Sequence, residues 1–256
     1  MQLWSRVCEN FEAGVLWGDN MRFDPHGHDE FVVSTNICGN ENFRLDQKSM
    51  QAETGTTTYY NPAQIQSGEG TNKLVSLYLQ HDIFQKDFHL AQDINFKNPV
   101  QNCVETLVAM QALHAHILAG SEIGIVEELG IKVLQIGLQK NSSCQLERVP
   151  GRKDWRVERV KQRLQDDLAE TPDLKSLAHE VRLAKATLIR MFSAATGFPP
   201  VTWQRARRLQ RARSLLRSGH PIAFVAMDLG FSDQPHLCRQ FKNAFGMTPG
   251  KMQICH

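Results

Sequence analysis

Residues 222–250 of this 256-residue chain read "IAFVAMDLGFSDQPHLCRQFKNAFGMTPG". In this stretch Leu237, Phe241 and Phe245 recur at four-residue steps, which is the spacing of one buried face of an α-helix. A shorter apolar stripe lies before Gly230, and a glycine there permits the left-handed backbone of a tight turn. The pattern therefore predicts two short helices joined by a turn, a helix–turn–helix unit.

The polar residues of this stretch indicate what the unit does. We expect Phe231 to plug the turn and Ser232 to cap the second helix. Such a second helix can lie in a DNA major groove, where Arg pairs with guanine and Gln with adenine. The residues expected to contact bases here are Gln234, His236 and Arg239.

A second copy of the pattern lies about fifty residues earlier. Ala178 is the small residue that lets two helices cross closely, and Leu183 is the turn plug. Leu188 and Phe192 form the buried face of its second helix. The residues expected to reach bases from this unit are Lys185, Ala186, Thr187 and Arg190.

A long helix from about Pro199 to Ser218 is predicted to join the two units. Its roughly 20 residues give a length of roughly 30 Å, close to the roughly 34 Å between successive major grooves on one DNA face. We expect Arg205 and Arg207 on this helix, and Lys242 beyond it, to contact phosphates. The alternative is that these cations are merely solvated. The arginines of this helix are Arg205, Arg207, Arg208, Arg211, Arg213 and Arg217.

The two halves of the chain carry opposite charge. Residues 1–150 hold 10 basic and 18 acidic side chains, and residues 151–256 hold 19 and 9. A basic half suits a polyanionic partner, the alternative being a solvated basic surface. The charge changes sign at a polar stretch that contains Pro150-Gly151, so we predict domains 1–145 and 155–256 joined by a linker, 146–154.

The N-terminal half alternates as β-strands do, in "EFVVSTNIC" and in "KLVSLYLQ", where Val75, Leu77 and Leu79 share one face. Turn signals such as Gly39-Asn40 and Gly68-Glu69-Gly70 predict many short strands in a barrel or sandwich. After Pro99 the apolar spacing becomes helical and predicts a helical hairpin. The hairpin either covers the barrel or pairs with a second subunit. The fold class is α+β, with an all-α C-terminal domain.

Composition narrows the class of protein further. No run approaches the roughly 18 apolar residues of a membrane-spanning helix, and Arg6, Glu9 and Glu12 interrupt any apolar leader. We therefore expect a cytoplasmic protein without a membrane partner. The six cysteines are scattered and lack zinc-ligand spacing, so we expect them to be reduced.

Beyond these patterns, residues 157–252 resemble the AraC/XylS transcription regulators, whose signature is loosely "I..vA...GF.d..hl.r.FK..fG.tP". The resemblance implies a monomeric DNA-binding domain whose two recognition helices read adjacent major grooves, and control of transcription, most often activation. The first unit departs from the family, with Arg182 at the usual turn glycine and Ala184 at the usual Ser or Thr cap. We therefore predict that the second unit carries more of the sequence specificity.

"FDPHGHDEFVVSTNICG" and "ETGTTTYYNPAQIQSGEG" resemble the cupin-like N-terminal domain of such regulators. Metal cupins use an HxH pair with a later carboxylate and a later His. Here His26 and His28 supply the pair, but Gln66 replaces the later His, and an amide makes a poor transition-metal site. We expect an effector pocket without a metal, although the two histidines could be turn or surface residues. The expected polar anchors are His26, His28, Tyr59, Asn61 and Gln66.

The leading hypothesis is a DNA-binding transcription regulator of the AraC/XylS type that senses a small molecule, with no catalytic residue, metal or cofactor. Its expected partners are promoter DNA, a small-molecule effector, a second copy of the chain and RNA polymerase. One alternative is a cupin metalloenzyme with a basic appendage, which Gln66 disfavours. Another is a regulator controlled by a partner protein or by dimerisation alone.

Overall fold

The computed structural model describes residues 2–45, 48–80, 82–90, 94–142, 154–245 and 248–254. They form two compact units, Met1–Arg148 with Ala184–Thr187, and Val149–Leu183 with Leu188–His256. The predicted linker 146–154 lies outside the described residues except for Asp154. The exact domain boundaries therefore stay a prediction.

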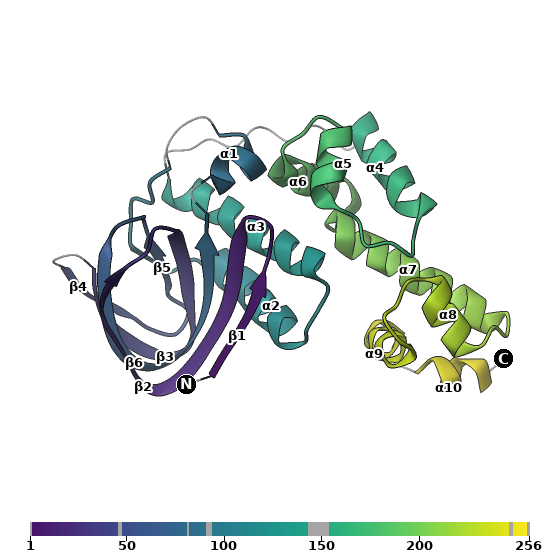
Figure 1. Ribbon diagram of the computed structural model, residues 1–256, viewed down its shortest axis with the longest axis horizontal. Helices are drawn as coiled ribbons and strands as arrows, with labels where there is room; N and C mark the ends of the chain where they lie inside the picture. The colour runs from purple at the N-terminus through teal and green to yellow at the C-terminus, as the bar shows by residue number, and fades with distance from the viewer. Residues whose placement is uncertain are drawn as a thin grey trace. The chain divides into compact units, whose positions relative to one another are not determined.

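The first unit is an antiparallel sheet that curls around an interior (Figure 1). Pairing runs in the order β1-β2-β6-β3-β5-β7, with β4 beside β3, so over the described residues the barrel stays open. The strands are β1 (Gln2–Val7), β2 (Phe11–Gly27), β3 (Phe31–Leu45), β4 (Lys48–Ala52), β5 (Thr57–Tyr60), β6 (Ile65–Leu79) and β7 (Val100–Gln101).

The expectation of many short strands is confirmed for β1, β4, β5 and β7. It was wrong for β2, β3 and β6, which run for 17, 15 and 15 residues. Two predicted turns lie inside paired strands. Gly39 has φ +89°, and a Cβ there would lie 1.9 Å from the Thr71 carbonyl oxygen; a Cβ at Gly70 would lie 2.2 Å from the Asn40 carbonyl oxygen. Glycine in a strand marks a bulge or a close backbone approach as well as a turn, and here it lets long strands bend.

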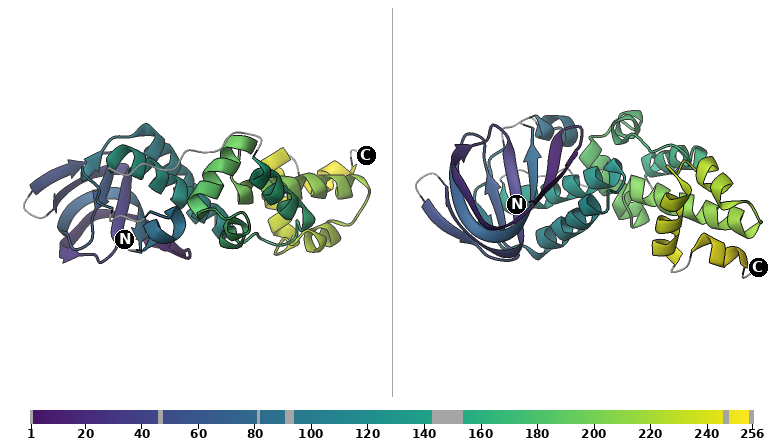
Figure 2. Two further views of the ribbon diagram at one scale, coloured as in Figure 1. Left: turned by 90° about the horizontal axis from the view of Figure 1, so that it is seen from above. Right: turned by 60° about the horizontal axis from the view of Figure 1, so that its bottom comes forward.

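The predicted alternation in β6 is confirmed: Val75, Leu77 and Leu79 are fully buried, while Ser76 and Tyr78 face the interior. The helical hairpin is confirmed as α2 (Val104–Leu118) and α3 (Ile123–Asn141), preceded by α1 (Ile83–Phe88). α2 and α3 lie side by side, and α2 lies against β1, β2, β3 and β6 (Figures 1 and 2). The hairpin therefore covers the sheet.

The second unit is all helical, as predicted. Its helices are α4 (Trp155–Asp166), α5 (Leu174–Glu180), α6 (Lys185–Thr196) from Leu188 onward, α7 (Pro200–Arg217), α8 (Ile222–Asp228), α9 (Gln234–Phe245) and α10 (Pro249–Ile254). One core lies around Leu188 and Phe192, and a second lies around Leu237 and Phe241. Among the described helices of the chain, none is long and apolar enough to cross a membrane.

Candidate nucleic-acid interface and ligand cavity

The two predicted helix–turn–helix units share the same turn geometry. In the first, the Leu183 amide donates to the Ala178 carbonyl oxygen at 2.9 Å; in the second, the Phe231 amide donates to the Ala226 carbonyl oxygen at 2.9 Å. These bonds satisfy carbonyls at the ends of α5 and α8 that the helices leave free. Similar local bonding, 48 residues apart, therefore builds both turns.

The residue before each plug has a left-handed backbone, Arg182 at φ +54° and Gly230 at φ +67°. A Cβ at Gly230 would lie 2.0 Å from the Ala169 carbonyl oxygen, so this turn excludes every residue except glycine without a backbone shift. The Arg182 side chain is exposed. Arg182 thus adopts a left-handed backbone conformation, which costs a non-glycine residue roughly 1–2 kcal/mol.

The cap of α9 differs from the prediction. Asp233, and not Ser232, accepts the His236 amide hydrogen with its carboxylate, because the carboxylate stands three residues before that amide, as an N-cap side chain does. Ser232 instead contacts the imidazole, with its Oγ 3.0 Å from His236 Nδ1, while Gln240 engages Nε2. His236 is thus held by contacts within its own unit.

The outer face of α9 presents Pro235, Arg239 and Lys242, all exposed. Arg239 and Lys242 lie about 60° apart around the helix axis, whereas Gln234 lies about 140° from Arg239. Gln234 is exposed at the first helical position. The predicted base-contacting residues therefore do not share one face: Arg239 lies on the exposed stripe, and Gln234 lies at the N-terminal tip.

The other predicted DNA contacts lie on α6 and α7. Lys185, Ala186 and Thr187 form the first turn of α6 and are buried, with the Lys185 ammonium ion-paired to Glu9, Asp87 and Glu127 at 3.1, 3.2 and 2.6 Å. These three predicted base contacts are therefore not accessible in this structure. Arg190 follows one turn later and is half-buried. On α7, Arg205 is half-buried; Arg207 is exposed, stacks 5.0 Å over the Trp203 ring and donates to Gln210.

Arg208 is no phosphate ligand in this structure. It is 2% exposed, its Nε donates to the Leu168 carbonyl oxygen at 2.6 Å, and its Nη2 donates to the Glu170 carbonyl oxygen at 3.1 Å. Gln204, also buried, donates to the carbonyls of Leu164 and Asp167. The α7 face that carries these two residues therefore binds the last turn of α4 and the segment that follows it.

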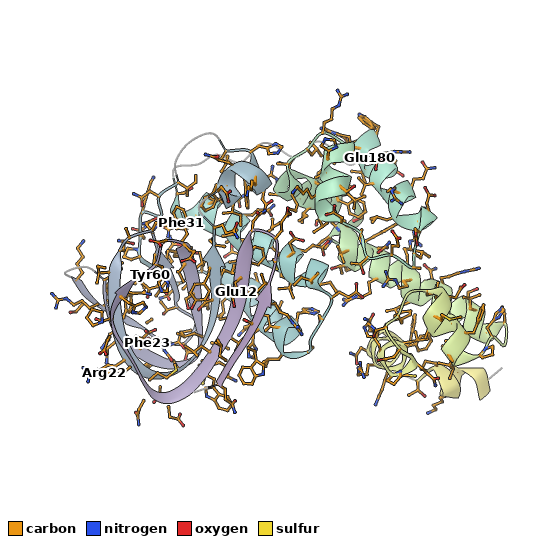
Figure 3. The ribbon with its side chains drawn as sticks, in the orientation of Figure 1. Glu12, Arg22, Phe23, Phe31, Tyr60 and Glu180 are labelled. Atoms are coloured by element: carbon orange, nitrogen blue, oxygen red, sulfur yellow. The ribbon has the colours of Figure 1, made fainter. Side chains whose placement is uncertain are left out.

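In the first unit, the curled sheet encloses a cavity of about 110 Å³. Three of the five predicted anchors line it: His26, His28 and Gln66. Phe23 and Tyr60 also line it, and both lie inside the curl of the sheet in Figure 3. His26 lies at the end of β2 and His28 directly follows that strand; both are half-buried, so they are cavity residues as well as near-surface ones.

Gln66 forms a hydrogen bond with the His26 ring nitrogen that a metal ion would need as a ligand. His26 Nδ1 donates to the Asp24 carbonyl oxygen at 2.8 Å, which leaves Nε2 to accept from Gln66 Nε2 at 3.3 Å. The His26 and His28 rings meet edge to face at 5.0 Å, and burial lowers the pKa of His28, as does the neighbouring His26. In the described parts of the chain, His, Cys, Asp and Glu form no group of three that could hold a metal.

Tyr59 and Asn61 do not join this cavity. They line a separate depression with Phe96, whose ring lies 4.9 Å from that of Tyr59. Asn61 clamps the Phe96 backbone, accepting from its amide at 2.9 Å and donating to its carbonyl at 3.1 Å. Both residues thus hold Phe96 against the sheet.

Residues that the sequence did not single out complete the cavity. Ser34 and Ser76 face each other with their Oγ atoms 2.8 Å apart. Tyr60 and Tyr78 add two phenols, and Glu41 adds a carboxyl whose pKa burial raises to about 7. The alternation in "KLVSLYLQ" already placed Ser76 and Tyr78 on one face, a signal that could have pointed to both.

Known families match both units of the chain. A model described as "AraC-like ligand binding domain" matches residues 12–134, and one described as "Helix-turn-helix domain" matches residues 177–253. The multiple antibiotic resistance protein MarA of Salmonella typhimurium is 33% identical over 92 residues, which cover 36% of this chain and 72% of MarA.

Two further relatives cover more of this chain. The arabinose operon regulatory protein of Escherichia coli K12 is 30% identical over 129 residues, 50% of this chain and 44% of that protein. The HTH-type transcriptional regulator YbfI of Bacillus subtilis 168 is 25% identical over 243 residues, 89% of this chain and 86% of YbfI. The chain thus spans about half the length of the first of these two and most of the second.

Proposed function

The chain belongs to the AraC family of transcription regulators, and from this membership we propose that it binds promoter DNA and responds to a small molecule held in its N-terminal unit. α9 lies in a major groove, with Arg239 as its principal base-reading residue and Gln234 at its tip. The observation that carries this proposal is the exposed Arg239 beside Lys242 on a helix whose opposite face buries Leu237 and Phe241.

The second reading helix is α6, with Lys185, Ala186, Thr187 and Arg190, and we propose that it contributes less specificity than α9, because the first three of these residues are buried in this structure. Ala186 offers no hydrogen bond to a base, and Arg182 strains the turn before the helix. His236 has a supporting role, because Ser232 and Gln240 engage its ring nitrogens. Arg205, Arg207 and Lys242 contact phosphates.

Selection of binding sites from a random duplex library tests the proposal with the full chain. On the selected site, Arg239→Ala weakens binding by about 1–3 kcal/mol and relaxes the preference at one base pair. Lys242→Ala, the matched control on the same helix, weakens all sequences alike and reduces the salt slope by about one. Failure to enrich any sequence contradicts the proposal.

The remaining partners are a second copy of the chain and RNA polymerase. Val104 and Val108, 73% and 57% exposed, stand one turn apart on α2. Exposed apolar side chains at helical spacing suit pairing with another helix. The hairpin therefore both covers the sheet and offers a surface for a homodimer, and we assign the chain no catalytic residue.

A further inference from the structure

The interior cavity of the N-terminal unit contains a carboxylate with no opposite charge beside it. Glu41 extends from β3 into the cavity and is 9% exposed. Asn72 Nδ2 donates to Glu41 Oε2 at 3.3 Å. Among the described residues that line the cavity, Glu41 is the single acidic side chain, and neither Lys nor Arg accompanies it.

Burying such a carboxylate is unfavourable unless a cation compensates it, at several kcal/mol per ion. The protein nevertheless makes room for it: a Cβ at Gly68 would lie 2.6 Å from Glu41 Oε1. Burial raises the pKa of Glu41 to about 7, so near neutral pH this carboxyl is partly ionised. A ligand that brings a positive charge would bind the ionised form and complete the pairing.

The two phenols and His28 around the cavity do not supply that charge. Burial raises the pKa values of Tyr60 and Tyr78, so both phenols stay neutral. Burial also lowers the pKa of His28, which favours its neutral form. His26, the remaining titratable lining residue, accepts a hydrogen bond from Gln66 at Nε2.

Aromatic rings form much of the wall around this carboxyl. Phe43 and Tyr60 meet edge to face with centroids 6.0 Å apart, and Phe23 and Tyr78 line the same cavity. The negative faces of such rings attract cations, most of all quaternary ammonium groups, in desolvated sites. An anionic or purely apolar ligand would leave Glu41 uncompensated.

We propose that this cavity binds the head group of a small organic cation, an alkylammonium, with the Glu41 carboxylate as counter-charge and the rings of Phe43 and Tyr60 as walls. A cavity of roughly 150 Å³ takes up benzene, so the 110 Å³ here suits a head group of about five heavy atoms. The rest of the ligand lies in an adjoining open depression of about 820 Å³, which shares Phe23, Phe43 and Gly68 with the cavity.

The test compares choline with its uncharged carbon analogue, in which a quaternary carbon replaces the nitrogen. Titration calorimetry on the full chain, with a chelator present and at about pH 8, should show choline binding at least about tenfold tighter than the analogue. At about pH 7 the binding of choline should release protons, because it shifts Glu41 to its ionised form. Equal binding of the two ligands, no binding of choline, or no proton release overturns the proposal.

Two variants assign the binding to residues. Glu41→Gln keeps the shape and the contact with Asn72 but removes the charge, so choline should bind at least about tenfold more weakly while the analogue is unaffected. Tyr60→Leu should weaken choline more than the analogue. Glu53→Gln, on an exposed loop, is the matched control and should change neither. Full choline affinity in Glu41→Gln rules out the assigned counter-charge.

The inference rests on the proposed function where it makes the cation an effector, and the two can fail separately. A chain that selects a DNA sequence but does not bind choline loses the cation site and keeps the regulator. Binding of choline without selection of any DNA leaves the cavity assignment and removes the regulator. If both occur, a choline-dependent change in DNA affinity that Glu41→Gln abolishes makes the cation the effector, and its absence refutes that role.

Discussion

The left-handed residue in the turn of each helix–turn–helix unit allows backbone strain to be added in one unit and removed in the other. The first change is made at Gly230. Gly230→Ala adds a Cβ 2.0 Å from the Ala169 carbonyl oxygen at φ +67°. The left-handed backbone costs alanine roughly 1–2 kcal/mol, the less flexible unfolded chain returns about 0.4–1 kcal/mol, and the overlap adds about 1–3 kcal/mol. We expect a loss of about 2–4 kcal/mol in the free energy of unfolding.

Gly219→Ala isolates the overlap from the backbone strain. Gly219 has φ +83°, but nothing lies within 4 Å of an added Cβ, so the expected loss is about 0.5–1 kcal/mol. Arg182→Gly runs the other way: it relieves the strain at φ +54°, loses some of that gain to the more flexible unfolded chain, and should stabilise by about 0.5–1 kcal/mol.

Calorimetry of the full chain gives the stabilities, and hydrogen exchange of peptides from α5–α6 and α8–α9 locates the changes. Gly230→Ala should accelerate exchange in α8–α9, and Arg182→Gly should slow it in α5–α6. Equal losses for Gly230→Ala and Gly219→Ala would mean that the Ala169 carbonyl does not constrain the turn. Destabilisation by Arg182→Gly would refute the backbone strain that we assign to Arg182.

Three further predictions concern a buried acid, a buried cation and an exposed face. For Glu41, a folded pKa of about 7 against an ordinary 4.5 means that the folded state holds the proton more tightly, so stability falls as pH rises between these values. The free energy of unfolding of Glu41→Gln should match that of the wild type below about pH 4.5 and exceed it by up to about 3 kcal/mol above about pH 7. Urea unfolding at a series of pH values measures this difference, and parallel curves of stability against pH would contradict the burial of this carboxyl. Arg208→Ala removes both hydrogen bonds to the carbonyls of Leu168 and Glu170 and should lower the free energy of unfolding by roughly 2–4 kcal/mol. The control Arg211→Ala, at an exposed position of α7, should change it by no more than about 0.5 kcal/mol. Similar thermal stability of the two variants would mean that Arg208 does not hold the segment after α4. Val108→Asp on α2 should shift sedimentation from dimer to monomer while circular dichroism stays unchanged, and an unchanged sedimentation coefficient would place the pairing surface elsewhere.

The helical half could be predicted closely from the sequence, because its spacing and its turn chemistry agree. The buried pair Leu237 and Phe241 fixed the face of α9, and Gly230 marked a turn in which only glycine fits. What the pattern could not separate were neighbours of equal capping propensity. Ser232 and Asp233 both suit an N-cap, and the choice between them depends on where the first helical residue falls.

Arginines on α7 mark a different limit. Arg208 and Arg211 stand three positions apart in an arginine-rich run and look alike in sequence, yet one is buried and one exposed. The burial of Arg208 depends on carbonyls of the segment after α4, some forty residues earlier. Such carbonyls are offered by any backbone, so residue type does not reveal which cation will find them.

Glu41 escaped prediction because a strand does not keep its parity through a bulge. Before the irregularity between Asn36 and Cys38, the even positions of β3, Val32 and Ser34, line the cavity; after it the odd positions do, Glu41 and Phe43. Strict alternation from Val33 would place Glu41 on the face that the hairpin covers, and from that face its carboxylate would not indicate a ligand site. The bulge beside Gly39 turns that acid inward, so the same local feature that bends the sheet also sets the charge of the cavity, and a proposal about the ligand becomes possible once the register is known.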